Sequence, residues 1–123
     1  MYSVSKRILI VEDEPNIVES LTFLLEHAGF VVSSVSDGAL ALEQVSTLMP
    51  ALVILDVMLP NRSGFDILRD IRGLSDQPKV LMLTAKGQAR DRQAADEIGV
   101  DRFMTKPFAN AEIVRAAKDM TAV

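Results

Sequence analysis

The chain has 123 residues, the size of one ordinary domain, and 49% of them are hydrophobic, as in a globular protein rather than a disordered one. The net charge of −4 gives no general electrostatic basis for binding nucleic acid or an anionic membrane surface. The absence of cysteine excludes disulfides and thiolate metal sites, and no apolar run approaches the ~20 residues of a membrane span. We therefore expect one cytoplasmic domain spanning residues 1–123.

The first half of the chain alternates short apolar runs with helical patterns. The first run ends in acidic residues and Pro15, which suits the first turn of a helix. Apolar residues then recur at helical spacing until Gly29, a good C-terminal stop. The third run continues unbroken into Asp56, which is typical of a strand buried on both faces. The expected elements are strands over 8–11, 30–35 and 51–55, and helices over 15–28 and 39–48.

The second half continues the same alternation. A third helix is expected over 65–71 and should break near Gly73. The following strand ends in a hydroxyl, and the helix after it has little but alanine to bury, so we expect that helix to be loosely held. Asn110 is expected to cap the last helix. The remaining elements are strands over 79–84 and 101–105, and helices over 88–98 and 110–120.

Five strand–helix units in succession define the fold class. Strands that alternate with helices predict a parallel sheet with helices on both faces and right-handed crossovers. The expected architecture is α/β, a (βα)5 doubly wound sheet of the flavodoxin-like type with strand order 2-1-3-4-5. No linker, repeat or low-complexity segment interrupts it.

Candidate functional residues lie at the ends of the first, third, fourth and fifth strands, and the carboxyl edge of the sheet brings them together. Because the first and third strands are neighbours in this order, Glu12, Asp13 and Asp56 should converge. Three close carboxylates repel, and they either raise one pKa or recruit a cation. Oxygen ligands with room for water suit Mg²⁺. Thr84 and Lys106, which end the fourth and fifth strands, could hold the oxygens of a phosphoryl group there.

This arrangement resembles the receiver domains of two-component response regulators, and the match runs through nearly the whole chain. The pattern of that family is an acidic pair after the first strand, aspartate after the third, threonine or serine after the fourth, and Lys-Pro after the fifth. The matching positions are Glu12-Asp13, Asp56, Thr84 and Lys106-Pro107. No single motif is specific, but their joint occurrence at strand ends is.

The resemblance implies a phosphoacceptor and a metal site. Asp56 would accept a phosphoryl group from a sensor histidine kinase or a phosphotransfer protein. Asp13, Asp56 and the backbone carbonyl of Met58 would bind Mg²⁺ directly, while Glu12 would act through bound water. Such a domain is a signalling protein and not an enzyme, although it assists its own phosphorylation and its slow dephosphorylation. Met58 and Lys86 should tune the rate of hydrolysis.

The resemblance also implies a switch. Lys106 would pair with Asp56 at rest and with phosphate afterwards, and the Thr84 hydroxyl would contact a phosphate oxygen. Movement of Thr84 would open space for Phe103, at a position where the family often has tyrosine. The loop after Thr84 and the helix over 88–98 would then change the face that this helix forms with the fifth strand and the last helix. A cis peptide before Pro107 would aim the lysine.

The downstream partner is not evident from the sequence. We expect no output domain within these 123 residues. Two alternatives are open: a stand-alone regulator that binds a protein target, and a receiver cut from a longer protein. The stretch 83–108 resembles the winged-helix transcription-factor branch, although Arg102 stands where a second acid is usual. A homodimer through the switching face is also open. The sequence does not identify the kinase.

Other functions are open to this pattern. An aspartyl-phosphate phosphohydrolase of the haloacid dehalogenase type also has an aspartate after a parallel strand, but it needs an acid two residues later, where this chain has Met58. A pseudo-receiver that binds partners without phosphate is the main rival, and the intact set of acids, hydroxyl and lysine argues against it. A flavodoxin-like electron carrier would need a phosphate-binding loop where Glu12-Asp13-Glu14 stands.

Overall fold

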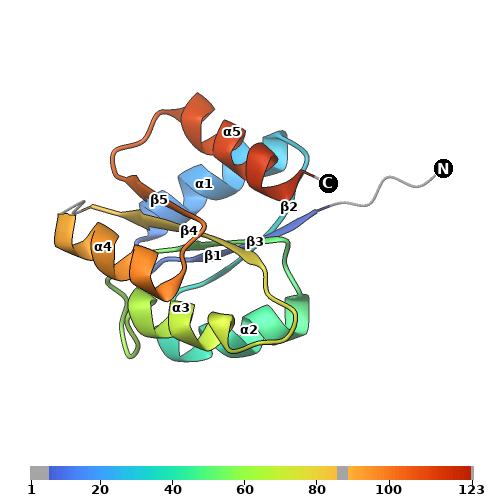
Figure 1. Cartoon of the computed structure of the whole chain (residues 1–123). Coiled ribbons are helices and arrows are strands. Elements are labelled where there is room, and N and C mark those ends of the chain that lie inside the picture. The colour runs from blue at the N-terminus through green and yellow to red at the C-terminus, as the bar shows by residue number, and fades with distance from the viewer. Residues whose placement is uncertain (1–5, 86–88, 123) are drawn as a thin grey trace.

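A five-stranded parallel sheet forms the centre of the molecule in the computed structural model, which describes residues 6–85 and 89–122 (Figure 1). The strands are β1 (Arg7–Val11), β2 (Val31–Val35), β3 (Leu52–Leu55), β4 (Lys79–Thr84) and β5 (Arg102–Thr105). They lie in the order β2-β1-β3-β4-β5, and every neighbouring pair is parallel. The predicted fold class and strand order are confirmed.

Helices cover both faces of the sheet. They are α1 (Pro15–His27), α2 (Ala41–Leu48), α3 (Gly64–Arg72), α4 (Ala89–Ile98) and α5 (Asn110–Thr121). Helices α1 and α5 lie on one face, and α2, α3 and α4 lie on the other (Figure 1). Among the described residues, no helix combines the length and the apolar character needed to cross a membrane.

Alternate residues of each central strand enter two separate apolar clusters. On β1, Leu9 and Val11 pack with residues of α2, α3 and α4, whereas Ile8 and Ile10 pack with residues of α1 and α5. All four side chains are at most 1% exposed. Each such burial contributes about 1.5–3 kcal/mol. The strand is therefore buried on both faces, as its continuous apolar run predicted.

The second helix begins later than predicted. A 3₁₀ turn, Gly38–Leu40, precedes α2, because the Asp37 side chain accepts a hydrogen bond from the backbone N–H of Ala39 at 2.9 Å. This side-chain bond tightens the first turn, and the α-helix proper starts only at Ala41. The pattern of apolar residues alone could not separate the two kinds of helix.

The predicted cap of the last helix is wrong by one position. Ala109, with extended backbone angles, is the N-cap of α5 and makes no side-chain hydrogen bond. Its carbonyl accepts hydrogen bonds from the N–H groups of Glu112 and Ile113, so Asn110 already lies inside the first turn. Asparagine has a high intrinsic preference for the cap, and the backbone path after β5 overrides it here.

Helix α4 is held mainly at its C-terminal end. Ala95 is the one residue in its described length that is fully buried, which agrees with the predicted weak anchoring. Beyond its end, the guanidinium of Arg72 donates to the carbonyls of Gly99 (2.8 Å) and Pro78 (3.2 Å) and to the carboxylate of Asp101 (2.6 Å). This network ties the turn after α4 to α3 at the amino-terminal edge of the sheet.

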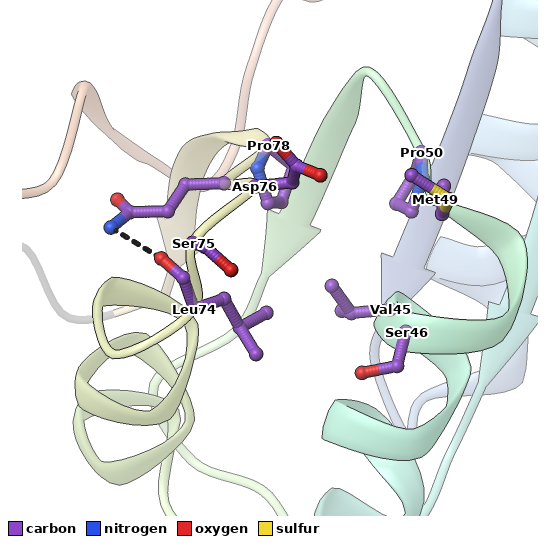
Figure 2. A pocket seen from close by; sticks show the side chains of 9 residues that line it. Val45, Ser46, Met49, Pro50, Leu74, Ser75, Asp76 and Pro78 are labelled. Atoms are coloured by element: carbon purple, nitrogen blue, oxygen red, sulfur yellow. Dashed lines mark hydrogen bonds between the residues drawn. The ribbon is translucent and has the colours of Figure 1, made fainter.

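A cavity of about 340 Å³ opens at that same edge, between the end of α2 and the segment before β4 (Figure 2). Val45 and Met49 line it from one side, and Leu74 and Pro78 line it from the other. The acidic residues after β1 and β3 lie at the opposite edge, so this cavity is separate from the candidate site.

Candidate functional site at the carboxyl edge of the sheet

The ends of β1 and β3 place two acidic residues side by side. The backbone N–H of Asp56 donates to the carbonyl of Val11 at 3.1 Å, which continues the pairing of the two strands by one residue. The N–H of Glu12 donates to Val35 in the same way on the other side of β1. The apolar runs thus end together, and the first polar residue of each run lies at the edge.

Three carboxylates gather at this edge. One oxygen each from Glu12, Asp13 and Asp56 lies within 4.8 Å of the other two. The side chains of Glu12 and Asp56 are 4% and 11% exposed, whereas Asp13 is exposed to solvent. Oxygen ligands of this kind, with one side open to water, fit Mg²⁺. The structure therefore brings together the three acids that the sequence predicted to converge.

Lys106 supplies the positive charge that faces the cluster. Its Nζ lies 2.5 Å from Oε1 of Glu12 and 3.5 Å from Oδ2 of Asp56, and its side chain is 12% exposed. Burial on its own would lower the pKa of Lys106, but the hydrogen bond with Glu12 and the charges of Asp56 and Glu12 raise it overall. The lysine is therefore held protonated between two carboxylates. Its nearer partner is Glu12, which sequence reasoning did not foresee.

Both oxygens of the Glu12 carboxylate already accept hydrogen bonds from the protein. Oε1 faces Lys106, and Oε2 accepts from the backbone N–H groups of Asp13 (3.0 Å) and Glu14 (3.3 Å). These bonds satisfy the polar atoms of a carboxylate that is almost fully buried. Glu12 is thus fixed in orientation, and it shapes the site without directing a free oxygen toward solvent.

The loop after β3 is pressed against α3. Oδ1 of Asp56 accepts from the N–H of Val57 at 2.7 Å, and the N–H of Gly64 donates to the Val57 carbonyl at 2.8 Å. A Cβ on Gly64 would lie 2.1 Å from the backbone oxygen of Asp56. The close approach of the two backbones therefore requires glycine at position 64. Met58 projects outward from the loop and is 69% exposed.

The residues that end β4 and β5 complete the edge. Thr84 is buried (3% exposed), and its carbonyl accepts from the N–H of Lys106 at 2.7 Å. The Lys106–Pro107 peptide bond is cis. Two predictions lie outside the described residues: the influence of Lys86 on the rate of hydrolysis, and the start of the fourth helix at Gln88.

Phe103 is buried on β5, and an arginine of α4 covers its ring. Phe103 is 7% exposed, and the guanidinium carbon of Arg92 lies 5.7 Å from the ring centroid. This distance is within the range of a cation–π interaction. The contact fastens the N-terminal half of α4, which carries no fully buried residue among those described, to the sheet.

Replacing Arg92 should loosen that half of the helix. We expect Arg92→Gln to accelerate backbone amide exchange there by about two- to fivefold, because an exposed cation–π contact contributes about 0.5–1 kcal/mol. Hydrogen–deuterium exchange followed by mass spectrometry measures this. Arg90→Gln removes the same charge from the same helix and serves as the control. Equal acceleration in both variants would contradict a specific role for the contact with Phe103.

Comparison with known proteins places this geometry in a family. The family model of the response regulator receiver domain matches residues 8–118. The chain is 41% identical over 110 residues to the alkaline phosphatase synthesis transcriptional regulatory protein PhoP of Bacillus subtilis, covering 89% of this chain and 46% of that protein. It is also 41% identical over 114 residues to the DNA-binding response regulator MtrA of Mycolicibacterium smegmatis, covering 93% of this chain and 50% of that protein.

A solved structure agrees with the sequence relatives. The receiver domain of the sensor histidine kinase PA1611 from Pseudomonas aeruginosa, with a magnesium ion coordinated in its active site cleft, superimposes with a TM-score of 0.89 at 26% identity and covers 98% of this chain and 100% of that one. A doubly wound sheet with acids at its carboxyl edge defines the class of protein. The chain belongs to the response regulator receiver domain family. It spans about half the length of the curated relatives that it matches.

Proposed function

We propose that the chain is a phosphorylation-driven switch in which Asp56 accepts a phosphoryl group from a histidine kinase or a phosphotransfer protein. The observation that carries this proposal is the position of Asp56, whose carboxylate lies 3.5 Å from Nζ of Lys106 and within the cluster formed with Glu12 and Asp13. An Asp56 oxygen would form the new bond to phosphorus while the bond from phosphorus to the donor nitrogen breaks.

The residues of the cluster fit Mg²⁺, which is bound in the active site cleft of the PA1611 receiver domain. Asp13, Asp56 and the backbone carbonyl of Met58 would hold the ion. Glu12 would act through water, because both of its oxygens accept hydrogen bonds within the protein. When bound, the ion neutralises the phosphoryl oxygens during an in-line transfer.

Lys106 and Thr84 would hold the transferred group. Lys106 is already charged and lies between Glu12 and Asp56, so a short movement of its ammonium would bring it to a phosphoryl oxygen on Asp56. The hydroxyl of Thr84, at the end of the next strand, would contact another oxygen. Met58 and Lys86 would influence the approach of the water that hydrolyses the acyl phosphate, which makes the signal temporary.

The output would pass through the face formed by α4, β5 and α5. Displacement of Thr84 toward the phosphoryl group would let Phe103 and α4 change position, and the weak anchoring of α4 favours this. PhoP is a transcriptional regulatory protein and MtrA is a DNA-binding response regulator, and each is about twice as long as this chain. We therefore include in the proposal an output through a DNA-binding domain as well as through a separate protein target. A homodimer through the same face is one assembly that fits. Within this proposal, residues 1–123 act as a single receiver domain.

The test is intact mass after incubation with acetyl phosphate, with and without Mg²⁺. We expect one phosphoryl adduct that depends on Mg²⁺ in the wild type and none in Asp56→Ala, with an unchanged adduct in the control Asp76→Ala. An adduct retained by Asp56→Ala would contradict the assignment of the phosphoacceptor. No adduct in the wild type, together with no binding of beryllofluoride, would favour a pseudo-receiver instead.

A further inference from the structure

Two loops that are distant in sequence are joined beside the candidate site. The first is the turn after β2, and the second is the segment 57–62 after β3, although β1 lies between these strands in the sheet. Oδ1 of Asp37 accepts hydrogen bonds from the side-chain amide of Asn61 at 3.0 Å and from the backbone of its own turn. The N–H of Gly38 donates to the carbonyl of Pro60 at 3.1 Å. The segment is thus attached to the turn through one side chain and one backbone group.

The fit between the loops depends on Gly38. This residue is buried, and a Cβ on it would lie 2.3 Å from the backbone oxygen of Arg62 and 2.9 Å from that of Pro60. Any side chain would therefore push the segment away. Asp37-Gly38 is therefore more than a local turn before a helix, because the glycine also permits this close approach of the second loop.

Asn61 adopts a backbone conformation that few residues tolerate. Its φ is 70°, in the left-handed region, where asparagine and aspartate are the commonest residues after glycine. The hydrogen bond from Asn61, followed by that from the turn backbone, lowers the pKa of Asp37 below its ordinary value. The acceptor is a carboxylate, and hydrogen bonds to a charged group are stronger than those between neutral groups.

We propose that Asp37, Gly38 and Asn61 are positioning residues that hold the segment 57–62 in place as a platform for the metal. This inference rests on the proposed function, in which the backbone carbonyl of Met58 binds Mg²⁺. The segment is attached at two points on either side of Met58: the Val57 carbonyl to Gly64, and the Pro60 carbonyl to Gly38. A carbonyl between two fixed points keeps its direction without the ion, so less conformational freedom is lost when the ion binds.

Removing the link should weaken metal binding more than it affects the chemistry. For Asn61→Ala we expect the dissociation constant of Mg²⁺, measured by isothermal titration calorimetry without a phosphoryl donor, to rise about two- to tenfold, the worth of one hydrogen bond. Exchange of the Gly38 amide proton should accelerate. The rate of adduct formation from acetyl phosphate at saturating Mg²⁺ should stay near that of the wild type.

An exchanged pair provides the rescue. In the double variant Asp37→Asn with Asn61→Asp, the new amide at position 37 still accepts from the Ala39 N–H through oxygen and donates to the new carboxylate at position 61. Net charge is unchanged, and aspartate tolerates the left-handed conformation. We expect Asp37→Asn alone and Asn61→Asp alone to lose Mg²⁺ affinity, and the double variant to recover it. Asp76→Ala, in the loop before β4, is the control for loss of a surface acid.

The outcomes separate the positioning role from the proposed function. Mg²⁺ dissociation constants that are equal in the wild type and in Asn61→Ala would overturn the positioning role and leave the phosphoacceptor function standing. Weaker binding in both the single variants and the exchanged pair would also overturn it, because the link would then not be the cause. A wild-type protein that binds no Mg²⁺ and forms no adduct would overturn both.

Discussion

Gly64→Ala should lower the free energy of unfolding by about 3 kcal/mol, since overpacking against fixed atoms costs about 1–3 kcal/mol and here both partners are backbone. The new Cβ would lie 2.1 Å from the carbonyl oxygen of Asp56 and 2.8 Å from the Cα of Val57. No side-chain rotation relieves such contacts, so the start of α3 or the end of β3 must move. Urea unfolding followed by far-UV circular dichroism measures the loss.

The same helix offers a matched control for this substitution. Gly73 caps the C-terminus of α3 with φ −85°, and the nearest atom to a Cβ there would lie 3.4 Å away. Gly73→Ala should therefore be neutral or stabilising by up to about 1 kcal/mol, because alanine restricts the unfolded chain. If Gly64→Ala were as stable as Gly73→Ala, the close packing of α3 on the loop after β3 would be contradicted.

Lys106→Met should also lower the free energy of unfolding strongly. Methionine keeps most of the volume of the lysine stem but leaves the carboxylates of Glu12 and Asp56, 4% and 11% exposed, without their cation. Removal of one partner from a buried ion pair costs about 3–5 kcal/mol, and we expect about 3 kcal/mol at pH 7.5, because Asp13 leaves the site open to water. Lys118→Met, on the exposed side of α5, should change stability by less than about 0.5 kcal/mol.

The stability that Lys106→Met loses should depend on pH in a defined direction. The pKa of Lys106 in the folded protein lies above the ordinary lysine value of 10.5, so its pairing stabilises the protein fully below pH 10.5. Stability then falls as pH rises from 10.5 through the folded pKa, because the unfolded chain releases its proton first. The difference in the free energy of unfolding between the wild type and Lys106→Met should therefore narrow above pH 10.5. A gap that stays constant there would mean that lost packing, and not lost charge, causes the effect.

The elements that could be predicted are those whose signal is local. Each buried strand is a continuous apolar run that ends at a polar residue. The runs that end at Glu12 and Asp56 therefore predict both the strand and the point where the chain reaches the edge of the sheet. Parallel pairing of adjacent strands then brings these ends together without further information. The acid cluster followed from this pattern, and the structure brings its three members within 4.8 Å.

The features that could not be predicted depend on contacts between distant segments. Asp37 and Asn61 are 24 residues apart, and nothing in either local sequence indicates that one side chain meets the other. Lys106 likewise lies nearer to Glu12, 94 residues away in the chain, than to Asp56, and no local pattern indicates which of the two acids is the nearer partner. The predicted cap of α5 at Asn110 was wrong for a related reason, because local preference yields to the path of the chain, which places the cap at Ala109.

The burial of β1 and β3 on both faces has a consequence for folding specificity. In a strand with one polar face, slippage by one residue is prevented because it would expose apolar side chains and bury polar ones. Here Leu52 to Leu55 are all buried, so alternation of polarity gives no such protection. The acid at the end of the run gives protection in one direction. Slippage of β3 along β1 toward the amino-terminal edge of the sheet would draw Asp56 between the two apolar layers, at a cost of several kcal/mol. The residue proposed to receive the phosphoryl group thus also opposes slippage of the central strands in that direction.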